Sequence, residues 1–128
     1  MIYGIGTDLC KVERMGRSLQ SKAFWQRVFG PQEREALFAL GEKRRMESAA
    51  ACFAAKEAFL KAAGRGLGGF DLGDIQALRR ESGAPYYRLS GSAAEWMEQN
   101  GLRAWLSLTH EDGLAQAMTV LEKSGVGD

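Results

Sequence analysis

The sequence contains no apolar run that approaches about 18 residues, the length typical of a membrane-spanning helix, so we expect no transmembrane segment. It contains only two cysteines, Cys10 and Cys52, and their spacing matches no metal-binding motif. Two isolated thiols are typical of a reduced protein, and we therefore expect a cytoplasmic location. Residues 1–3 lead directly into a predicted strand, so we expect no cleavable leader.

The sequence also has almost no net charge. Lysine and arginine number 17 against 16 aspartates and glutamates, for a net charge of +1, so the protein lacks the overall positive field of many nucleic-acid-binding proteins. The hydrophobic fraction of 45% and the charged fraction of 26% are ordinary for a soluble globular protein. We find no internal repeat and expect one domain over residues 1–122, followed by a frayed tail at 123–128.

The strongest pattern in the sequence is a helix. Residues 49–63 are rich in alanine, and no glycine or proline interrupts them before Gly64, which readily ends a helix with positive φ. The segment is apolar almost all round, which predicts a buried helix whose charged residues are Lys56, Glu57 and Lys61. Glu57 and Lys61 are four residues apart, so they form an ordinary surface pair or face a pocket, a metal ion or an anionic ligand.

Residues 2–9 alternate as in a strand, which would place Tyr3, Ile5, Thr7 and Leu9 on one face and Gly4, Gly6 and Asp8 on the other. We expect the first of these faces to join the core. The two glycines beside the Asp8 carboxylate indicate that a ligand or another backbone approaches closely. The alternative is a tight strand crossing in which Asp8 caps the following helix.

Basic residues gather at three places. Residues 11–28 predict one or two short helices with a basic face, which is either solvated or a docking surface for an acidic partner. Lys43 and Arg44 open the long helix, where cations oppose the helix dipole, so stability does not explain them and phosphate binding is favoured. Residues 64–69 form a glycine-rich segment, either a flexible turn or a loop whose amides approach a ligand, but it matches no nucleotide-binding fingerprint.

The second half of the chain is mainly β. A turn at residues 82–85 joins two predicted strands, a helix follows over 91–99, and strands at 102–110 and 114–121 form a hairpin. His110, the only histidine, ends the first strand of this hairpin. It is either a plain surface residue or a group that titrates near neutral pH in a site.

Three separate motifs in the sequence resemble those of one protein family. They are Gly-Ile-Gly-Thr-Asp at residues 4–8, Phe-Ala-Ala-Lys-Glu-Ala-Phe-Leu-Lys-Ala at 53–62 and Ser-Leu-Thr-His at 107–110. Together they resemble the short bacterial holo-acyl-carrier-protein synthases of the 4′-phosphopantetheinyl transferase superfamily, from Met1 to about Leu121. The resemblance implies an α+β fold with a long central helix packed on an antiparallel β-sheet, and a homotrimer with active sites between subunits. It also implies Mg²⁺-dependent transfer of 4′-phosphopantetheine from coenzyme A to a serine of apo acyl carrier protein, releasing adenosine 3′,5′-bisphosphate, in fatty acid biosynthesis.

The resemblance also implies roles for residues. Asp8 and Glu57 would hold Mg²⁺, with pyrophosphate oxygens and water completing its coordination. The expected catalytic residues are Glu57, which could accept the serine proton, Lys61, which would stabilise the leaving phosphate, and His110. The expected contacts with coenzyme A are Lys43, Arg44, Lys61, Gly64, Arg65, Gly66, Pro85 and His110. The expected contacts with the acidic carrier protein are Arg14, Arg17 and Lys22.

The sequence departs from the family pattern at two positions. Cys52 stands where many relatives carry arginine, and Arg65, where threonine is common, is a candidate replacement for that cation. Ala84 stands where lysine is common. Two other functions stay open from the sequence. One is a non-catalytic module that binds coenzyme A or a carrier protein, and the other is a Mg²⁺-dependent hydrolase of coenzyme A.

Overall fold

The structure is a computed structural model that describes residues 1–66 and 69–124. Its elements, in chain order, are β1 (Ile2–Lys11), α1 (Val12–Ser18), α2 (Lys22–Val28), α3 (Pro31–Phe38), α4 (Glu42–Ala63), the 3₁₀ turn η1 (Leu72–Asp74), β2 (Ile75–Arg79), β3 (Pro85–Leu89), α5 (Gly91–Gln99), β4 (Leu102–Glu111) and β5 (Leu114–Lys123). The predicted α+β class is confirmed, as are the long helix and both hairpins.

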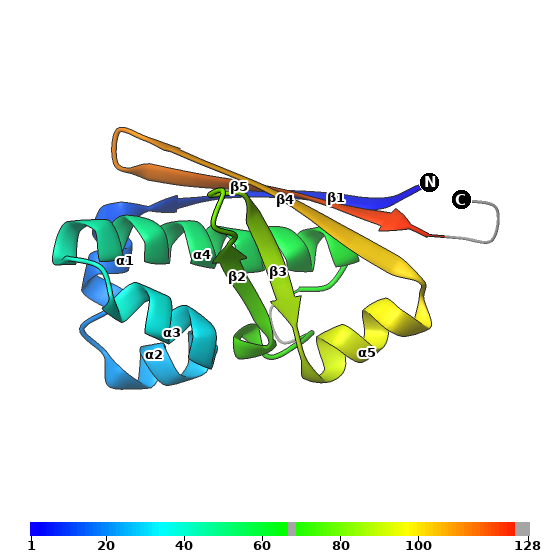
Figure 1. Cartoon of the computed structure of the whole chain (residues 1–128), viewed down its shortest axis with the longest axis horizontal. Helices are drawn as coiled ribbons and strands as arrows, with labels where there is room; N and C mark the ends of the chain where they lie inside the picture. Colours follow the sequence, from blue (N-terminus) through cyan, green and yellow to red (C-terminus); the bar gives the residue numbers. More distant parts are fainter. Residues whose placement is uncertain (67–68, 125–128) are drawn as a thin grey trace.

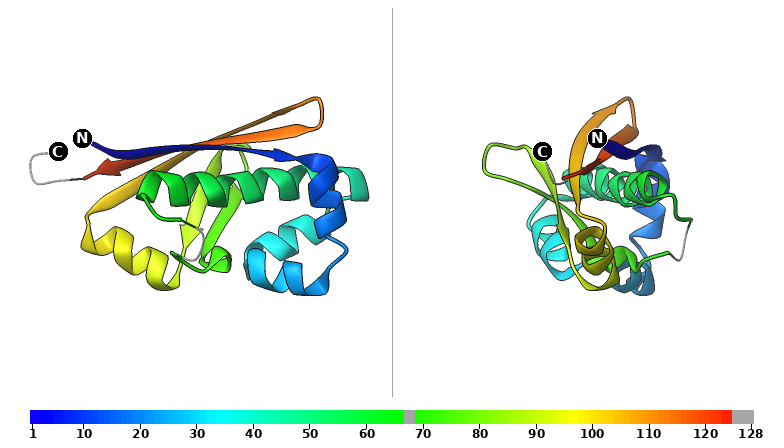
Figure 2. Two further views of the ribbon diagram at one scale, coloured as in Figure 1. Left: turned by 180° about the vertical axis from the view of Figure 1, so that it is seen from behind. Right: turned by 90° about the vertical axis from the view of Figure 1, so that its right-hand side faces the viewer.

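The long helix and a three-stranded antiparallel sheet form the centre of the fold. The sheet has the strand order β1-β5-β4, and β2 and β3 pair separately as an antiparallel hairpin. Helix α4 lies along one face of the sheet, with α1, α2 and α3 near its first half and α5 near its far end (Figures 1 and 2). Among the described residues, the opposite face of the sheet carries no helix, so it faces solvent in the single chain.

The contact between β1 and α4 explains the glycines of the first strand. A Cβ atom at Gly4 would lie 1.9 Å from the carbonyl oxygen of Ala62, and one at Gly6 would lie 1.9 Å from that of Ala58. Only glycine therefore allows the strand and the helix backbone to approach this closely. The close approach that the glycines indicated is made by another backbone, as in the alternative of a tight crossing. Asp8 does not cap the following helix, however, because Lys11 is the N-cap of α1.

The predicted orientation of β1 is wrong. We expected Tyr3, Ile5 and Leu9 to join the core, but their exposed fractions are 45%, 55% and 60%. The glycine face packs on α4 instead, because the larger side chains would not fit between the two backbones. Apolar side chains are consequently left on the outer face of the sheet.

Lys56 has a purely internal role. It is fully buried, and its Nζ donates to Glu33 Oε1 at 2.6 Å and to the carbonyls of Leu72 and Ile75 at 2.8 and 2.7 Å. Glu33 is buried too, and it accepts hydrogen bonds from backbone amides of Gly30 and Ala77. Burial lowers the pKa of Lys56 and raises that of Glu33, while their mutual attraction opposes both shifts. Lys56 therefore holds the interior of the protein together, although it lies on the same helix as Glu57 and Lys61.

The chain ends agree with the prediction only in part. Gly64 has φ 75° and ends α4, as expected. Strand β5 continues to Lys123, whose amide bonds to Met1, and Ser124 bonds to Gly101, so the two residues are not frayed. Residues 125–128 lie outside the described part of the chain. Within that described part, no helix is long and apolar enough to cross a membrane.

Candidate active site

The candidate site lies where β1 crosses the second half of α4. Lys61 Nζ lies 3.0 Å from Asp8 Oδ1 and also donates to the carbonyl of Thr7 at 3.0 Å. Asp8 and Lys61 are 53 positions apart in the chain, so the packing of β1 on α4 creates this pair. Lys61 thus pairs with Asp8 and does not form the local pair with Glu57 that its spacing allowed.

Glu57 lies beside this pair, one helical turn before Lys61. Its pKa is raised above the ordinary carboxyl value, first by burial and then by the negative charge of Asp8, while Lys61 opposes the shift. Asp8 and Glu57 therefore lie close enough together for the charge of Asp8 to disfavour the ionised form of Glu57. A divalent cation at these oxygens would remove that repulsion.

The donor set fits Mg²⁺ on chemical grounds. Mg²⁺ prefers hard oxygen ligands and is usually held by one or two carboxylates together with substrate phosphates and water. Asp8 and Glu57 supply two carboxylates, and across residues 1–66 and 69–124 no group of three or more His, Cys, Asp or Glu side chains could hold a metal. An ion at this place would therefore depend on substrate oxygens to complete its coordination.

A pocket of about 310 Å³ opens beside the two carboxylates. Its polar lining comes from Asp8, Arg14, Ser18 and Glu57, and its apolar lining comes from Leu9, Cys10, Met15, Phe24 and Phe53. Helix α1 therefore forms one wall of the candidate site. A partner that docks on α1 would bring its own groups within reach of Asp8 and Glu57.

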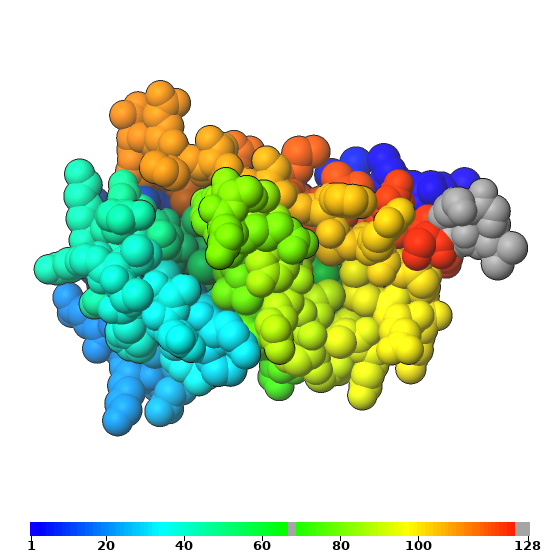
Figure 3. All heavy atoms as spheres, in the orientation of Figure 1, coloured from blue at the N-terminus to red at the C-terminus, as the bar shows by residue number. Residues whose placement is uncertain are grey.

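The three predicted carrier contacts differ in their surroundings. Arg14 lines the pocket beside Asp8 and Glu57. Arg17 pairs with Glu13 at 3.3 Å, but both side chains are largely exposed, so this pair contributes little to stability. Lys22 is exposed at the start of α2. Arg14 and Arg17 belong to α1 and Lys22 begins α2, and these two helices lie at the same end of the molecule (Figures 1 and 3).

A second polar cluster lies near the first half of α4. Arg44 and Ser48 of α4, Arg79 of β2 and His110 of β4 line one pocket of about 320 Å³, together with Glu47 and Ala51. An apolar cleft of about 380 Å³ shares four residues with this pocket, namely Arg44, Ser48, Ala51 and Arg79. Leu40, Tyr86 and Leu108 are among its other lining residues. We call the combined space the cationic groove.

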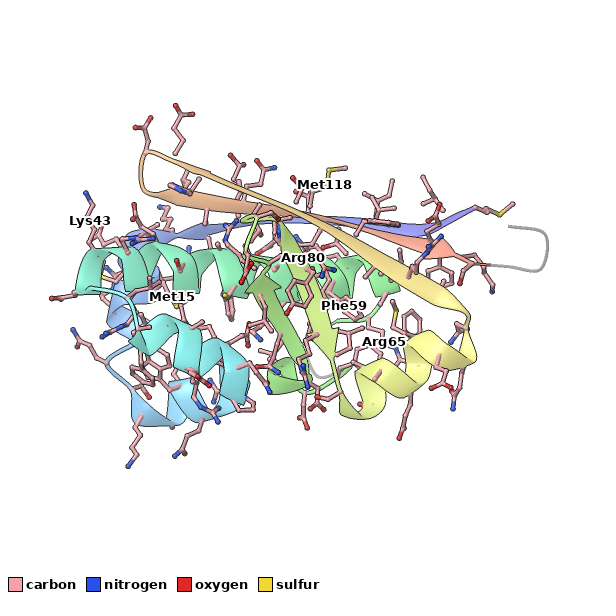
Figure 4. All side chains as sticks on the ribbon, in the orientation of Figure 1. Met15, Lys43, Phe59, Arg65, Arg80 and Met118 are labelled. Atoms are coloured by element: carbon pink, nitrogen blue, oxygen red, sulfur yellow. The ribbon has the colours of Figure 1, made fainter. Side chains whose placement is uncertain are left out.

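The remaining predicted contacts with coenzyme A lie at several places. Pro85 begins β3 directly opposite Arg79 of β2, at the edge of the cationic groove. Lys43 is exposed at the start of α4, whereas Arg65 lies near its far end (Figure 4). At 1.5 Å per helical residue these two cations are roughly 30 Å apart along the helix. One small ligand therefore cannot reach both of them in a single chain.

The glycine-rich segment does not offer the expected amide cradle at its start. The amides of Gly64 and Arg65 donate to carbonyls of Lys61 and Leu60, which closes the helix end. The guanidinium of Arg65 stacks over Phe70 at 4.6 Å and Trp96 at 5.5 Å. Gly66 is exposed, and Leu67 and Gly68 lie outside the described residues. The amides of Gly64 and Arg65 are therefore already engaged within the protein.

Arg65 also lies far from the position that it was expected to compensate. Cys52 lines the cleft beside Arg79, and its Sγ contacts the carbonyl of Ala77 at 3.5 Å. About 20 Å of helix separates positions 52 and 65. Within one chain, Arg79 is the nearer cation to Cys52, and sequence reasoning missed it. The sequence signal that could have revealed it was the consecutive pair Arg79-Arg80 at the end of a strand. Neighbouring strand residues point to opposite faces, so the two arginines had to lie on different sides of the hairpin.

Comparisons with known proteins place the chain in a family. Residues 4–118 match the 4′-phosphopantetheinyl transferase superfamily, so the chain belongs to that superfamily. A holo-(acyl-carrier-protein) synthase from Leptothrix cholodnii is 39% identical over 98% of this chain and 100% of its own length. The enzyme of the same description from Geotalea daltonii is 42% identical over 96% and 100%.

Solved structures agree with this assignment. The holo-(acyl-carrier-protein) synthase from Neisseria meningitidis superposes with a TM-score of 0.85 at 34% identity, covering 96% of this chain and 100% of its own. The one from Bacillus anthracis, solved in complex with CoA (3′,5′-ADP), gives a TM-score of 0.83 at 33% identity, covering 97% and 99%. The resemblance found in the three sequence motifs is thereby confirmed.

Proposed function

We propose that this protein transfers the 4′-phosphopantetheine group of coenzyme A to a serine hydroxyl of apo acyl carrier protein and releases adenosine 3′,5′-bisphosphate. The observation that carries the proposal is the meeting of Asp8, Glu57 and Lys61 at one place in a member of the 4′-phosphopantetheinyl transferase superfamily. The relatives described above are holo-(acyl-carrier-protein) synthases, and one was solved with CoA (3′,5′-ADP).

Asp8 and Glu57 are the residues that would hold Mg²⁺. When bound, the ion would neutralise charge on the diphosphate and lower the barrier to its cleavage. The two carboxylates would hold the ion from a strand and a helix that pack backbone to backbone, and this packing leaves the distance between the two carboxylates little freedom. Asp8 is further held by Lys61, so its carboxylate is oriented before any substrate arrives.

Glu57 is suited to accept the proton of the attacking serine, and Lys61 is suited to stabilise the phosphate that leaves. Glu57 borders the pocket beside Asp8, so its carboxylate would lie within reach of the attacking serine hydroxyl and accept its proton. Lys61 carries an ammonium that is 56% exposed at its side chain, so it can reach the phosphate that leaves and stabilise the charge formed there. His110 lies with Arg44 and Arg79, which favours its role as a contact of coenzyme A over that of a base.

We further propose a homotrimer whose sites form between subunits. Two observations support this assembly. The outer face of the sheet exposes large apolar side chains, including 54% of Trp105 and 47% of Met118 besides those of β1, and such a continuous surface is typical of an interface. The predicted coenzyme A contacts also lie at separate places along α4, and a second copy could supply the cationic groove to the Asp8 site of the first.

The carrier protein would dock on α1 and α2. Arg14, Arg17 and Lys22 form a basic surface beside the pocket that contains Asp8 and Glu57, and carrier proteins of this class are acidic. Complementary charge would steer the encounter and orient the serine toward Glu57. The reaction belongs to fatty acid biosynthesis in the cytoplasm, and the location is supported by two cysteines that are both free in the structure.

The direct test is the intact mass of apo acyl carrier protein after incubation with this protein, coenzyme A and Mg²⁺. A single gain of one phosphopantetheine group that a chelator abolishes is expected. Binding of the carrier without a mass gain would instead favour a non-catalytic module. Cleavage of coenzyme A without a change in the carrier would favour a hydrolase. Size-exclusion chromatography with light scattering tests the trimer separately, and a monomer would contradict it.

A further inference from the structure

The turn of α4 that carries Glu57 is tied to two other elements. The hydroxyl of Tyr87, in the middle of β3, donates to the carbonyl oxygen of Ala55 at 2.6 Å. Three residues further along the helix, the carbonyl of Ala58 lies so close to β1 that a Cβ at Gly6 would be 1.9 Å from its oxygen. Glu57 stands between these two contacts in the helix, so both of them restrain the turn that presents its carboxylate.

The direction of the hydrogen bonds at Tyr87 follows from the groups present. A carbonyl oxygen can only accept, so Tyr87 uses its single hydroxyl proton for the bond to Ala55. The hydroxyl of Thr119, in β5, lies 2.6 Å from the Tyr87 oxygen and therefore donates to it. Burial raises the pKa of Tyr87, so its hydroxyl stays a neutral donor at physiological pH. Two hydrogen bonds in series thus join β5, β3 and α4.

These hydrogen bonds and the glycine contact form one closed circuit. Thr119 is fully buried, and it is the register partner of Gly6 in the pairing of β5 with β1. The circuit runs from α4 through Tyr87 to Thr119, across the strand pair to Gly6, and back to α4 at Ala58. Asp8 lies two residues after Gly6 and on the same face of β1, because side chains alternate along a strand. Both carboxylates of the candidate site are therefore attached to this circuit.

The Tyr87 side chain does not border the candidate site. Its ring packs edge-on against the fully buried ring of Phe59, with 5.3 Å between the ring centroids (Figure 4). Tyr87 is also not among the described residues that line the pocket beside Asp8 and Glu57 or the cationic groove. Any effect of its hydroxyl on the reaction must consequently pass through the elements that it joins.

We propose that Tyr87 is a positioning residue that, through Ala55 and Thr119, fixes the placement of the Asp8 and Glu57 carboxylates and thereby the affinity of the site for Mg²⁺. This inference rests on the proposed function, in which the two carboxylates hold the ion. Residues that orient metal ligands from outside typically change metal affinity or activity by about 10- to 100-fold when they are replaced. Tyr87 acts through the helix backbone, so we expect an effect at the lower end of this range.

The test measures metal binding without catalysis. Mn²⁺ replaces Mg²⁺ as a spectroscopic probe and is titrated into the protein with coenzyme A but without carrier protein, while electron paramagnetic resonance follows the free ion. Coenzyme A alone is the blank. Tyr87→Phe should weaken the Mn²⁺ affinity by about 10-fold. Thr119→Ser, the matched control, keeps the hydroxyl that donates to Tyr87 and should change the affinity by less than about twofold.

A double variant separates positioning from stability. Tyr87→Phe alone leaves the buried Thr119 hydroxyl without its acceptor, which destabilises the fold. Tyr87→Phe/Thr119→Val contains no unpaired hydroxyl, so its urea unfolding should return close to that of the wild type. Its Mn²⁺ affinity should nevertheless stay about 10-fold weaker, and kcat should fall while the KM for carrier protein is unchanged. Wild-type Mn²⁺ affinity in the folded double variant would overturn the inference.

The same measurements distinguish this inference from its premise. If the wild type binds Mn²⁺ but transfers no phosphopantetheine, the proposed function falls, and a weaker Mn²⁺ affinity of the Tyr87 variants would still support the positioning role. If the wild type transfers the group and these variants bind Mn²⁺ equally well, the positioning role falls and the proposed function stands. Mn²⁺ binding that Asp8→Asn leaves unchanged would refute the metal assignment and the positioning role together.

Discussion

Lys56 and Lys61 belong to the same helix, yet one is structural and the other is available for chemistry. Lys56 is fully buried, and three protein oxygens accept its three hydrogen bonds. Lys61 donates to two oxygens among the described residues, while 56% of its side chain is accessible. A lysine whose donors are all satisfied internally cannot bind a substrate, whereas one with a free, solvated donor can. Two lysines five residues apart differ in this way because they point to different sides of α4.

The largest effect should come from Glu57, which lies between these lysines. Glu57→Gln keeps the shape of the side chain but removes the charge that we propose binds Mg²⁺ and accepts the serine proton. We expect the rate of phosphopantetheine transfer to fall by about 10³-fold, with urea unfolding unchanged within about 1 kcal/mol. Single-turnover mass spectrometry of the carrier protein measures the rate. A variant that retains near-normal activity would remove Glu57 from the site.

The buried lysine should affect stability most strongly. Lys56→Met leaves the Glu33 carboxylate buried without its partner, which typically costs about 3–5 kcal/mol. Urea unfolding followed by circular dichroism measures the loss. The double variant Lys56→Met/Glu33→Leu should recover much of it, because no unpaired charge is then left inside. If the single variant were as stable as the wild type, the pair would not hold α3, η1 and α4 together.

The exposed lysine should show the opposite pattern. Lys61→Met removes the group that we propose stabilises the leaving phosphate, and we expect transfer to fall by about 10²-fold. Its exposed pair with Asp8 is expected to contribute less than about 1 kcal/mol to stability. Measuring kinetics and urea unfolding on both lysine variants gives a direct contrast. A large loss of stability with normal activity in Lys61→Met would reverse the distinction drawn between the two.

The glycine contact beneath the site predicts a smaller change. Gly6→Ala would place a Cβ 1.9 Å from the carbonyl oxygen of Ala58, so β1 must shift away from α4 at a cost of about 1–3 kcal/mol. Because Asp8 follows on the same strand, activity should fall as well. Gly41→Ala is the control, since a Cβ there meets no atom within 4 Å, and it should change stability by less than about 1 kcal/mol. Equal unfolding midpoints for the two variants would contradict the close packing.

The smallest effect is expected at Cys52. Cys52→Arg adds a cation to a groove that Arg79 and Arg44 already line, so the KM for coenzyme A should change by less than about twofold, or about 0.4 kcal/mol. Steady-state kinetics with apo carrier protein measures it. A marked fall in KM would show that the groove lacks a cation in the natural sequence.

The sequence alone was sufficient for the elements that local patterns specify. The alanine-rich run ending at Gly64 predicted α4. The residue pair Asp112-Gly113 predicted the turn of the last hairpin. In the structure these two residues have the positive φ values of 51° and 76°. Glycine at residues 4 and 6 correctly signalled a close approach. The same pattern misled us about which face of β1 is buried, because alternation identifies two faces without saying which of them packs on the helix.

Other features depended on residues brought together from distant parts of the chain. Glu33 carries no sign in the sequence that it pairs with Lys56, and nothing in the spacing of Asp8 and Lys61 indicates their contact. Arg79 reaches the groove of Arg44 and His110 only because the β2–β3 hairpin folds across α4. Local sequence determined the helices, turns and motifs of this protein, since those depend on neighbouring residues. The tertiary structure decided which charges are buried, which are paired and which remain free to bind a ligand, since those depend on packing between distant segments.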